Sequence, residues 1–542
     1  MRKSGIFSIS ITVLLLIALL TNPSCSSKKD SIHDVTRPSE IYANNDTVLL
    51  GTFAHNGYQT ASYFCASLKE EVQELLNQKN KKGAFIYRKK DGKKYDLYRD
   101  ELKVYTTIDP QLQKYAETAV YKHLKTDLQP AFSKNNQAAR RFPFSNTFKG
   151  RKVTDQTIEN IMSRSRKSSS RYESMILQGY SPSEIEKSFT IPTSMQLFSW
   201  NGPIDTLLSP NDSIRYMKNF IQAGLISIEP STGEVKAWVG GIDHDNFPFD
   251  RVRQGKRQMG STIKPFTYAA AFSMGVIEPC TTLPPDNYCV DPCEPSGKRW
   301  CPAGIPKRDL TSNFIYSGGG VNVSVMSLMG ACSGPQAIDR IFKQMNIHLP
   351  EDQIVPSICL GTPDMSLMEI TSANTIFVNN GTYVTPRIIR RIEDKHGNVI
   401  YASKRISQKV IYETYSFDVL QLMKLVVERG TSAGLKWHEE WGGIPYPTAG
   451  ITGTTQANSD MWFVGMTPSL VTGVWTGGEY KQIRFRSKLW GQGARASLPI
   501  YGYYMQQVYN DSTLKISTDD FPPPESYDPA RFQCEDSLTK TP

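Results

Sequence analysis

A serine and a lysine three residues apart stand at a predicted turn-to-helix junction near the middle of the chain. Gly260 permits a tight turn, and the residues from Ser261 to Phe266 then begin a predicted helix. Lys264 therefore lies on the same helix face as Ser261, whose hydroxyl is close to the unpaired N–H groups of the helix start. A lysine that is shielded from water loses its proton more easily, and can then act as the base for a serine nucleophile. The pair predicts acyl-transfer chemistry.

The spacing of this pair is weak evidence by itself, because a chain of this length should contain about two Ser-x-x-Lys matches by chance. Ser26 to Lys29 is one such match, in a polar segment. The context is more specific. The stretch AGITGTT, residues 449–455, lies downstream and precedes two predicted strands. Ser-x-x-Lys followed by a Thr-Gly strand is the signature of serine β-lactamases and penicillin-binding proteins.

The elements that must position these residues are predicted from apolar alternation. Residues 225–229 and 234–239 flank the turn Pro-Ser-Thr-Gly, which indicates a hairpin. A second strand pair is predicted at 461–466 and 471–476. Strands at both ends, with helices between them, predict an α/β (α+β) domain whose antiparallel sheet is closed by the two chain ends. The predicted intervening helices are 265–274, 335–345 and 366–378.

The N-terminal part is predicted to be a helical linker or pedestal. We expect helices at 63–79 and 212–223, a strand at 102–107, and a helix to 119 that Asp109 caps. Residues 130–190 are polar and helix-prone, and the basic run 164–171 is expected to be a solvated, flexible segment. The predicted division is 1–25 signal peptide, 26–57 tether, 58–222 linker domain, 223–510 catalytic-type domain and 511–542 tail.

Composition excludes several classes of protein. The 542 residues are 39% hydrophobic and 21% charged, as in ordinary globular proteins of two or three domains. The net charge is +10, but the basic residues are scattered and accompany no nucleic-acid-binding motif, so we expect no nucleic acid partner. The seven histidines form no H-x-x-H pattern, so we expect no metal, and no cofactor motif is present.

The N-terminus predicts export and a lipid anchor. Arg2 and Lys3 precede a fifteen-residue apolar run, Ile6 to Leu20, which is shorter than the roughly 20 residues of a spanning helix. Ser24 and Cys25 follow as in a lipoprotein processing site, where Cys25 would be lipidated; the alternative is a plain cleaved signal. The polar stretch after Cys25 resembles the surface-export tags of some Bacteroidota lipoproteins. We therefore expect a protein of the cell envelope, anchored in the outer membrane on its periplasmic or surface face.

Four of the other eight cysteines cluster. In an exported protein such a cluster predicts one or two disulfides that staple a loop, with the pairing left open. This loop could be a partner-binding surface or a stabilised insertion. The clustered residues are Cys280, Cys289, Cys293 and Cys301.

From about residue 58 to residue 510 the chain resembles the transpeptidase half of class A penicillin-binding proteins, in particular those of Bacteroidota. The resembling stretches include LKVYTTIDPQLQ, GEVKAWVGGID, RQGKRQMGSTIKPF, VPSICLG, RIEDKHGNV and GTTQANSDMWFVGMTP. The resemblance implies a penicilloyl serine transferase fold whose serine is acylated by a D-Ala-D-Ala stem peptide or a β-lactam. It implies Ser261 as the nucleophile, Lys264 as its base and Ser317 as the proton relay of the second motif. Thr452 and Gly453 match the end of the third motif, and the N–H groups of Ser261 and Thr454 would form the oxyanion hole.

The sequence also departs from the family pattern, and these departures bear on whether the site is active. The family's glycosyltransferase half, which should precede residue 58, is not found in this sequence. The second motif, usually Ser-x-Asn, is Ser317-Gly318-Gly319, so Gly319 replaces the Asn; whether Asn322 reaches back is open. Ile451 replaces the lysine of the third motif, Lys-Thr-Gly. Each lost polar contact costs about 1.5–3 kcal/mol, roughly tenfold to a hundredfold in rate. A lysine or arginine from elsewhere, with Lys256 and Arg257 the nearest in sequence, could compensate.

Three functions compete on this evidence. The favoured one is a degenerate, penicillin-binding-protein-like lipoprotein that acts as a binding or scaffold module for envelope protein partners. A sensor of β-lactams or peptides, acylated but slow to turn over, is the second. The third is a weakly active serine D,D-transpeptidase or carboxypeptidase of peptidoglycan synthesis. A cell-surface location would exclude the third, because it would separate the protein from peptidoglycan.

Overall fold

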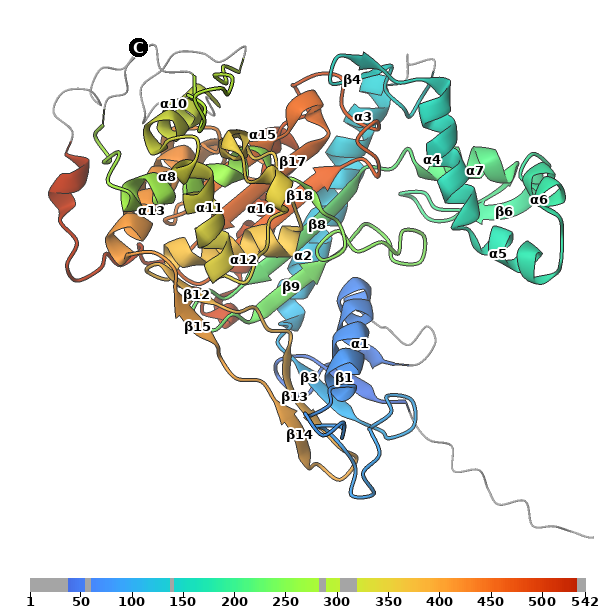
Figure 1. Ribbon diagram of the computed structural model, residues 1–542. Coiled ribbons are helices and arrows are strands. Elements are labelled where there is room, and N and C mark those ends of the chain that lie inside the picture. Colours follow the sequence, from blue (N-terminus) through green and yellow to red (C-terminus); the bar gives the residue numbers. More distant parts are fainter. Residues whose placement is uncertain (1–37, 54–59, 137–140, 282–288, 303–318, 534–542) are drawn as a thin grey trace, which may run out of the picture.

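The structure is a computed structural model and describes residues 38–53, 60–136, 141–281, 289–302 and 319–533. It has three parts: a central sheet covered by helices on both faces, a small sheet below it, and a helical lobe to one side (Figure 1). In these described ranges no helix combines the length and apolar character needed to cross a membrane.

The central sheet has five antiparallel strands in the order β16-β17-β18-β8-β9, so β16 is an edge strand. The two predicted hairpins are β8–β9 and β17–β18. Strand β18 pairs with β8 over seven residues, which confirms that the two chain ends close one sheet. The strands are β8 (Gln222–Ile228), β9 (Val235–Val239), β16 (Ala449–Thr454), β17 (Asp460–Met466) and β18 (Val471–Gly477).

Alternate residues of this sheet bury against different helix layers, as expected for strands of period two. On one face Ile451 and Trp462 join a core with the helices that follow the nucleophile segment. On the other face Phe463 and Val474 pack with α2 and α16. The first layer holds α8 (Lys264–Ser273), α10 (Gly319–Met329), α11 (Ser333–Gln344), α12 (Leu367–Val378) and α13 (Glu413–Arg429); the second holds α2 (Pro110–His123) and α16 (Leu498–Asn510).

The expected 58–222 domain is not one unit. Helix α2 is capped by Asp109, whose side chain accepts hydrogen bonds from the N–H groups of Gln111 and Leu112, as predicted. It packs, however, against β9 and α16 of the central body. Amphipathic spacing located this helix correctly but carried no information about which sheet its apolar side would cover. The predicted helix at 212–223 is α7, Pro210–Met217, and ends before strand β8 begins at Gln222.

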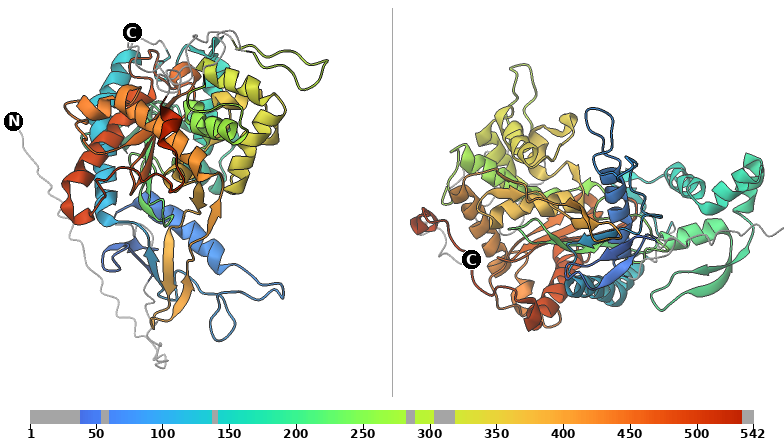
Figure 2. Two further views of the ribbon diagram at one scale, coloured as in Figure 1. Left: turned by 90° about the vertical axis from the view of Figure 1, so that its left-hand side faces the viewer. Right: turned by 90° about the horizontal axis from the view of Figure 1, so that it is seen from below.

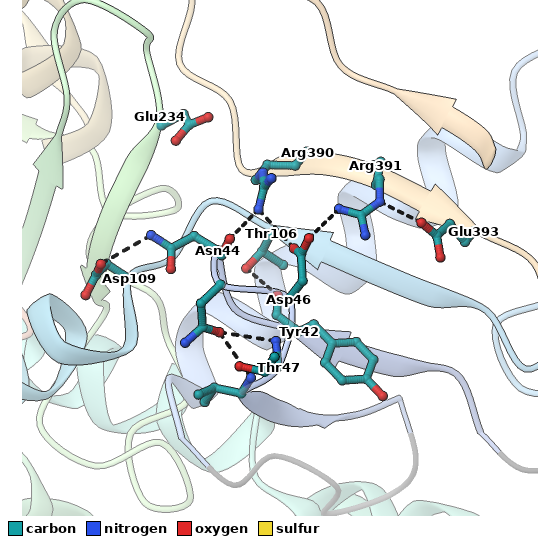
Figure 3. A network of polar contacts seen from close by, with 12 residues as sticks. Tyr42, Asn44, Asp46, Thr47, Thr106, Asp109, Glu234, Arg390, Arg391 and Glu393 are labelled. Atoms are coloured by element: carbon teal, nitrogen blue, oxygen red, sulfur yellow. Dashed lines mark hydrogen bonds and ion pairs between the residues drawn. The ribbon is translucent and has the colours of Figure 1, made fainter. Parts of the chain in front are cut away.

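The lower sheet joins segments far apart in the sequence, in the order β14-β13-β3-β1-β2. Part of the expected tether is therefore structured, since Ile41 and Leu50 are fully buried. Asp46 forms ion pairs of 2.9 Å with both Arg390 and Arg391, which ties the N-terminal strands to β13 (Figure 3). The elements are β1 (Glu40–Tyr42), β2 (Leu49–Thr52), β3 (Lys103–Thr106), β13 (Ile389–Glu393), β14 (Val399–Ala402) and, packed beside them, α1 (Ser62–Leu76).

The helical lobe projects from the body (Figures 1 and 2). The basic run 164–171 belongs to it and forms the end of α4 (Asp155–Lys167) and the start of α5 (Ser170–Leu177), so the expectation of a flexible segment is wrong. Arg164, Lys167 and Ser168 are exposed, as expected of a solvated run, but Arg166 is 7% exposed and pairs with Glu159 and Glu186. One carboxylate of its own helix and one of the neighbouring helix α6 (Pro182–Ser188) therefore hold Arg166 in place. The lobe contains α4, α5, α6, α7, β4 (Thr147–Phe148), β5 (Arg151–Lys152), β6 (Thr193–Leu197) and β7 (Ile204–Leu208); η1 (Leu124–Leu128) and α3 (Gln129–Asn136) lead to it.

The expected C-terminal tail is docked as far as the structure describes it. Phe521 is buried, and the Tyr527 hydroxyl donates to the fully buried carboxylate of Asp418, which also pairs with Arg531 at 2.7 Å. A buried carboxylate requires such partners. The remaining short elements are β10 (Arg257–Gln258), β11 (Asp364–Met365), β12 (Thr382–Val384), β15 (Ser407–Lys409), α14 (Gly434–Trp437), α15 (Gly493–Ala496), η2 (Gly260–Ile263), η3 (Glu351–Gln353), η4 (Pro356–Leu360), η5 (Gln456–Asn458), η6 (Ser512–Leu514) and η7 (Pro529–Phe532).

Candidate active site

The serine and lysine lie where a single 3-10 turn, η2, runs directly into α8. Gly260 has a φ of 55°, a left-handed conformation that glycine adopts without strain, and this bends the chain into the turn. Ser261 is partly exposed, whereas Lys264, one turn later, is completely buried. Pro265 near the start of α8 fits because the first helical N–H groups have no intrahelical acceptor. The local sequence thus presents the hydroxyl to solvent and holds the amine beneath it.

The backbone at Gly361, which follows η4, packs against the turn that carries Ser261. The N–H of Gly260 donates to the carbonyl of Gly361 at 3.0 Å. Gly361 itself has a φ of 71°, and a Cβ there would lie 1.9 Å from the carbonyl oxygen of Gly260. Only glycine fits this contact, so the segment after η4 fixes the position of Ser261 through direct backbone packing.

Burial sets the protonation of Lys264. The surrounding protein lowers the pKa of this amine from 10.5 to about 7, and desolvation is its cause. A large fraction of the amine is therefore neutral near neutral pH. A neutral amine one turn from a serine hydroxyl is the base that acyl transfer requires.

Edge strand β16 forms the opposite wall. The N–H of Thr455 donates to the carbonyl of Asp460 on β17 at 3.0 Å. Because N–H directions alternate along an antiparallel strand, the N–H of Thr454 faces the free edge, toward the nucleophile turn. A Cβ on Gly453 would lie 2.9 Å from the Cγ2 atom of Thr262, so β16 and η2 are in close contact. An oxyanion hole made by Ser261 and Thr454 would need this close approach of β16 to η2.

Between these walls lies a cavity of about 530 Å³ that reaches Ser261. Thr452 lines it, and its hydroxyl is 2.8 Å from that of Thr431, a residue that sequence reasoning missed. Lys488 is the only cationic residue among those that line the cavity in the described part of the chain. The lining residues are Ser261, Thr431, Thr452, Thr454, Thr455, Gln456, Ala457, Asn458, Lys488, Gln492 and Ala494.

Ile451 does not line this cavity. It is 1% exposed, pairs with Val464 on β17 and belongs to the same apolar core as Ile263. The side chain at the third-motif position therefore adds neither charge nor bulk to the cavity beside Ser261.

The two cations that sequence proximity suggested as replacements lie elsewhere. Lys256 pairs with Glu369 at 3.0 Å. Arg257 donates to the carbonyl oxygens of Gly478 and Glu479. Neither residue lines the cavity at Ser261. The alternative that one of them supplies a charge in place of the third-motif lysine therefore finds no support in their contacts.

The second-motif region is only partly described. Ser317 lies outside the described residues, and α10 begins at Gly319. Asn322 is buried, and its amide nitrogen donates to the carbonyl of Cys359 at 2.9 Å. Cys359 belongs to η4, which leads to Gly361. Asn322 therefore contacts the segment that supports the nucleophile turn.

Disulfides are present in the cysteine-rich segment, as predicted. Cys289 pairs with Cys301 inside the cluster, but Cys293 pairs with Cys332, which lies beyond it at the start of α11. Cys280 is also disulfide-bonded, and its sulfur contacts the carbonyl oxygen of Arg531. The disulfide between Cys293 and Cys332 therefore links the loop to the helical layer. The spacing of the cysteines along the chain could not predict this pairing.

Comparison with known proteins identifies this arrangement. Residues 223–477 match the family model described as penicillin binding protein transpeptidase domain, and residues 143–221 match the penicillin-binding protein middle domain. Penicillin-binding protein 1A of Rickettsia typhi is 27% identical over 529 residues, covering 88% of this chain and 61% of the relative. The corresponding protein of Aquifex aeolicus is 29% identical over 56% of this chain and 40% of its own length. The chain thus spans between two fifths and two thirds of the length of these relatives.

Solved structures show the same fold. The crystal structure of penicillin-binding protein 1A from Haemophilus influenzae superposes with a TM-score of 0.58 at 18% identity, over 89% of this chain and 74% of that one. PonA1 from Mycobacterium tuberculosis gives 0.53 at 20% identity, over 85% and 93%. With the α/β penicilloyl serine transferase fold and two matching family models, the chain belongs to the penicillin-binding proteins, of which it carries the middle and transpeptidase domains.

Proposed function

We propose that this protein binds peptidoglycan stem peptides or β-lactams and is acylated at Ser261, but turns over slowly enough to act as a binding module. The observation that carries the proposal is the combination of a buried Lys264 next to Ser261 with Ile451 at the third-motif position. The nucleophile can be activated, while a group that the family uses to hold its substrate is missing.

The acylation step follows from the geometry. Lys264 accepts the proton of the Ser261 hydroxyl, and Oγ attacks the carbonyl carbon of the bound amide or lactam. The N–H groups of Ser261 and Thr454 stabilise the oxygen anion that develops. The C–N bond then breaks, the leaving nitrogen takes the proton that Lys264 accepted, and an ester to Ser261 remains. Without the third-motif lysine, each lost charged contact costs about 1.5–3 kcal/mol, or roughly tenfold to a hundredfold in rate.

The contact made by Asn322 suggests a different register for the second motif. Gly320-Val321-Asn322 keeps the asparagine of Ser-x-Asn and loses the serine, whereas Ser317-Gly318-Gly319 keeps the serine and loses the asparagine. The hydrogen bond from Asn322 to the support of the nucleophile turn favours the first register. Under it, N322A should reduce acylation at least about tenfold, and S317A should have little effect. The reverse result would restore the Ser317 register.

A weakly active D,D-transpeptidase or carboxypeptidase is the second candidate, and Lys488 favours it. This exposed lysine lines the cavity and could pair with the carboxylate of a peptide terminus or β-lactam in place of the missing lysine. K488Q should then slow acylation by about tenfold. K395Q removes an exposed lysine in a distant turn and serves as the matched control. Equal rates in the two variants would exclude this role of Lys488.

Labelling with a fluorescent penicillin tests the proposed function directly. A related structure, PonA1 of Mycobacterium tuberculosis, is described as a complex with penicillin V. We expect slow, stable labelling that S261A abolishes and that S273A, a change at the C-terminal end of α8, leaves intact. Rapid release of D-alanine from a stem peptide would show the efficient enzyme instead. No label after long exposure would leave only a non-covalent binding module.

The location proposed for the protein is the outer membrane, through lipidation of Cys25. Mass spectrometry of the mature N-terminal peptide should find an acylated Cys25, and C25S should yield an unlipidated, mislocalised protein. A mature N-terminus at another residue, with Cys25 unmodified, would contradict the anchor. Crosslinking of the anchored protein in cells would then test the proposed envelope protein partners.

A further inference from the structure

A second cavity lies between the helical lobe and the central body, and it shares no lining residue with the cavity at Ser261. Its volume is about 860 Å³, and it is bounded by Ser168, which follows α4, and by the loop that precedes the nucleophile segment. Phe249 is 44% exposed at this cavity and Tyr480 also lines it. Clefts between domains are frequent ligand sites.

Arg251 lines this cavity and is 7% exposed. Its Nε atom is buried without a hydrogen-bond partner, and in the described part of the chain no carboxylate forms an ion pair with the guanidinium. The group instead stacks on Phe249, with 4.6 Å to the ring centroid, and lies 5.9 Å from the ring of Trp475. An arginine this deeply buried normally has a carboxylate or phosphate partner, because burying an unpaired charge is costly.

The neighbouring charges are already matched. Lys256 pairs with Glu369, and Lys218 pairs with Glu479, each at 3.0 Å. Arg257 lies 3.7 Å from Asp460 and donates to two backbone carbonyls. Arg251 is therefore the one unmatched charge among the described residues that line this cavity. One positive charge favours a monoanion, and the nearby carboxylate of Glu479 disfavours a dianion such as phosphate.

We propose that this cavity is a second ligand site, which takes a carboxylate group carried on an apolar or aromatic body. Arg251 would bind the carboxylate through its planar fork, and Phe249 and Tyr480 would contact the apolar part. Small organic acids and the carboxylate of a peptide share this chemistry. Burial lowers the pKa of Arg251 to about 10, which still leaves the guanidinium charged at neutral pH. The site is independent of the proposed reaction at Ser261.

Benzoate, neutral benzamide and inorganic phosphate are the probes that test this site. Titration calorimetry with the full chain should give a benzoate dissociation constant of about 1 mM or lower, with benzamide and phosphate at least about tenfold weaker. Tryptophan fluorescence should change on benzoate binding, because Trp475 lies beside Arg251. Phosphate binding more tightly than benzoate would overturn the carboxylate assignment. No benzoate binding below about 10 mM would overturn the site.

Variants locate the binding. R251Q should weaken benzoate at least about tenfold, and R253Q is the matched control, because Arg253 pairs with Glu71 and does not line the cavity. Should R251Q fail to fold, F249A changes an exposed ring and should weaken benzoate but not acetate. Benzoate affinity that is unchanged in both R251Q and F249A, or in F249A alone when R251Q does not fold, would refute the assignment.

Discussion

Replacement of Lys264 by methionine should change how the stability of the transpeptidase domain depends on pH. Burial lowers the pKa of this amine from 10.5 to about 7. Below pH 7 both the folded and the unfolded chain carry the proton, and the folded state holds a buried charge. Between about pH 7 and 10.5 only the unfolded chain keeps it. Because the unfolded state then binds more protons, the wild-type free energy of unfolding rises with pH across this window.

The size of this change depends on how much of the window from pH 7 to pH 10.5 is covered by the measurement. Between pH 6 and pH 9 the folded and unfolded chains differ in protonation over about two pH units, each worth about 1.4 kcal/mol, so the free energy of unfolding changes by about 2–3 kcal/mol. K264M has a side chain of similar length but no titrating group. Its free energy of unfolding, relative to wild type, should therefore fall by about 2–3 kcal/mol between pH 6 and pH 9.

Urea unfolding at several pH values measures this difference. Trp238, Trp462 and Trp475 are buried in the central sheet, so intrinsic fluorescence reports on the relevant domain. K395M, which changes an exposed lysine, controls for the loss of a positive charge. Parallel pH profiles for K264M and wild type, within about 0.5 kcal/mol, would refute the reasoning. In wild type the rate of penicillin labelling should also rise through pH 7, with about a tenth of its plateau at pH 6.

Three further predictions concern the supports of the site. G361A should destabilise the domain by at least about 2 kcal/mol and slow labelling, since a Cβ cannot be placed against Gly260; wild-type labelling would contradict the backbone contact. The double variant C293S/C332S should lose about 2–4 kcal/mol, seen as a lower urea midpoint than that of the C65S control, which changes a cysteine outside any described disulfide. R531A should expose residues 521–533 to hydrogen exchange, because the buried carboxylate of Asp418 loses its ion-pair partner; unchanged protection would show that apolar packing alone holds the segment.

The central hairpins and the nucleophile pair could be predicted from sequence because they are local. The turn residues 230–233 lie between two alternating runs, and Ser261 and Lys264 are one helical turn apart. The docking of Ile41 and Leu50 in the lower sheet could not be predicted, since it depends on β13, which lies far along the chain. The burial of Arg166 could not be predicted for the same reason, because Glu186 on α6 faces it only after the lobe folds.

The cavity beside Ser261 shows the same limit. Thr431 and Lys488 come from segments without a distinctive pattern, and only the closure of the sheet edge brings them to Thr452 and Ser261. Residues that act within one turn leave a signal in the sequence, whereas residues that complete a cavity do not. Lys256 and Arg257 make the converse point, because sequence proximity suggested a role that their actual partners exclude.

The replacement at residue 451 separates two functions that the usual lysine combines. In the family pattern the lysine at this position adds a positive charge and contributes to substrate binding. Ile451 adds to the apolar core instead, and burial alone lowers the pKa of Lys264 to about 7. Under the proposed function, Ser261 would thus be activated without the missing charge, whereas binding of a substrate carboxylate would be weakened by its loss. The expected result is a site whose nucleophile can be activated but whose substrate is held weakly, which favours slow acylation over efficient turnover.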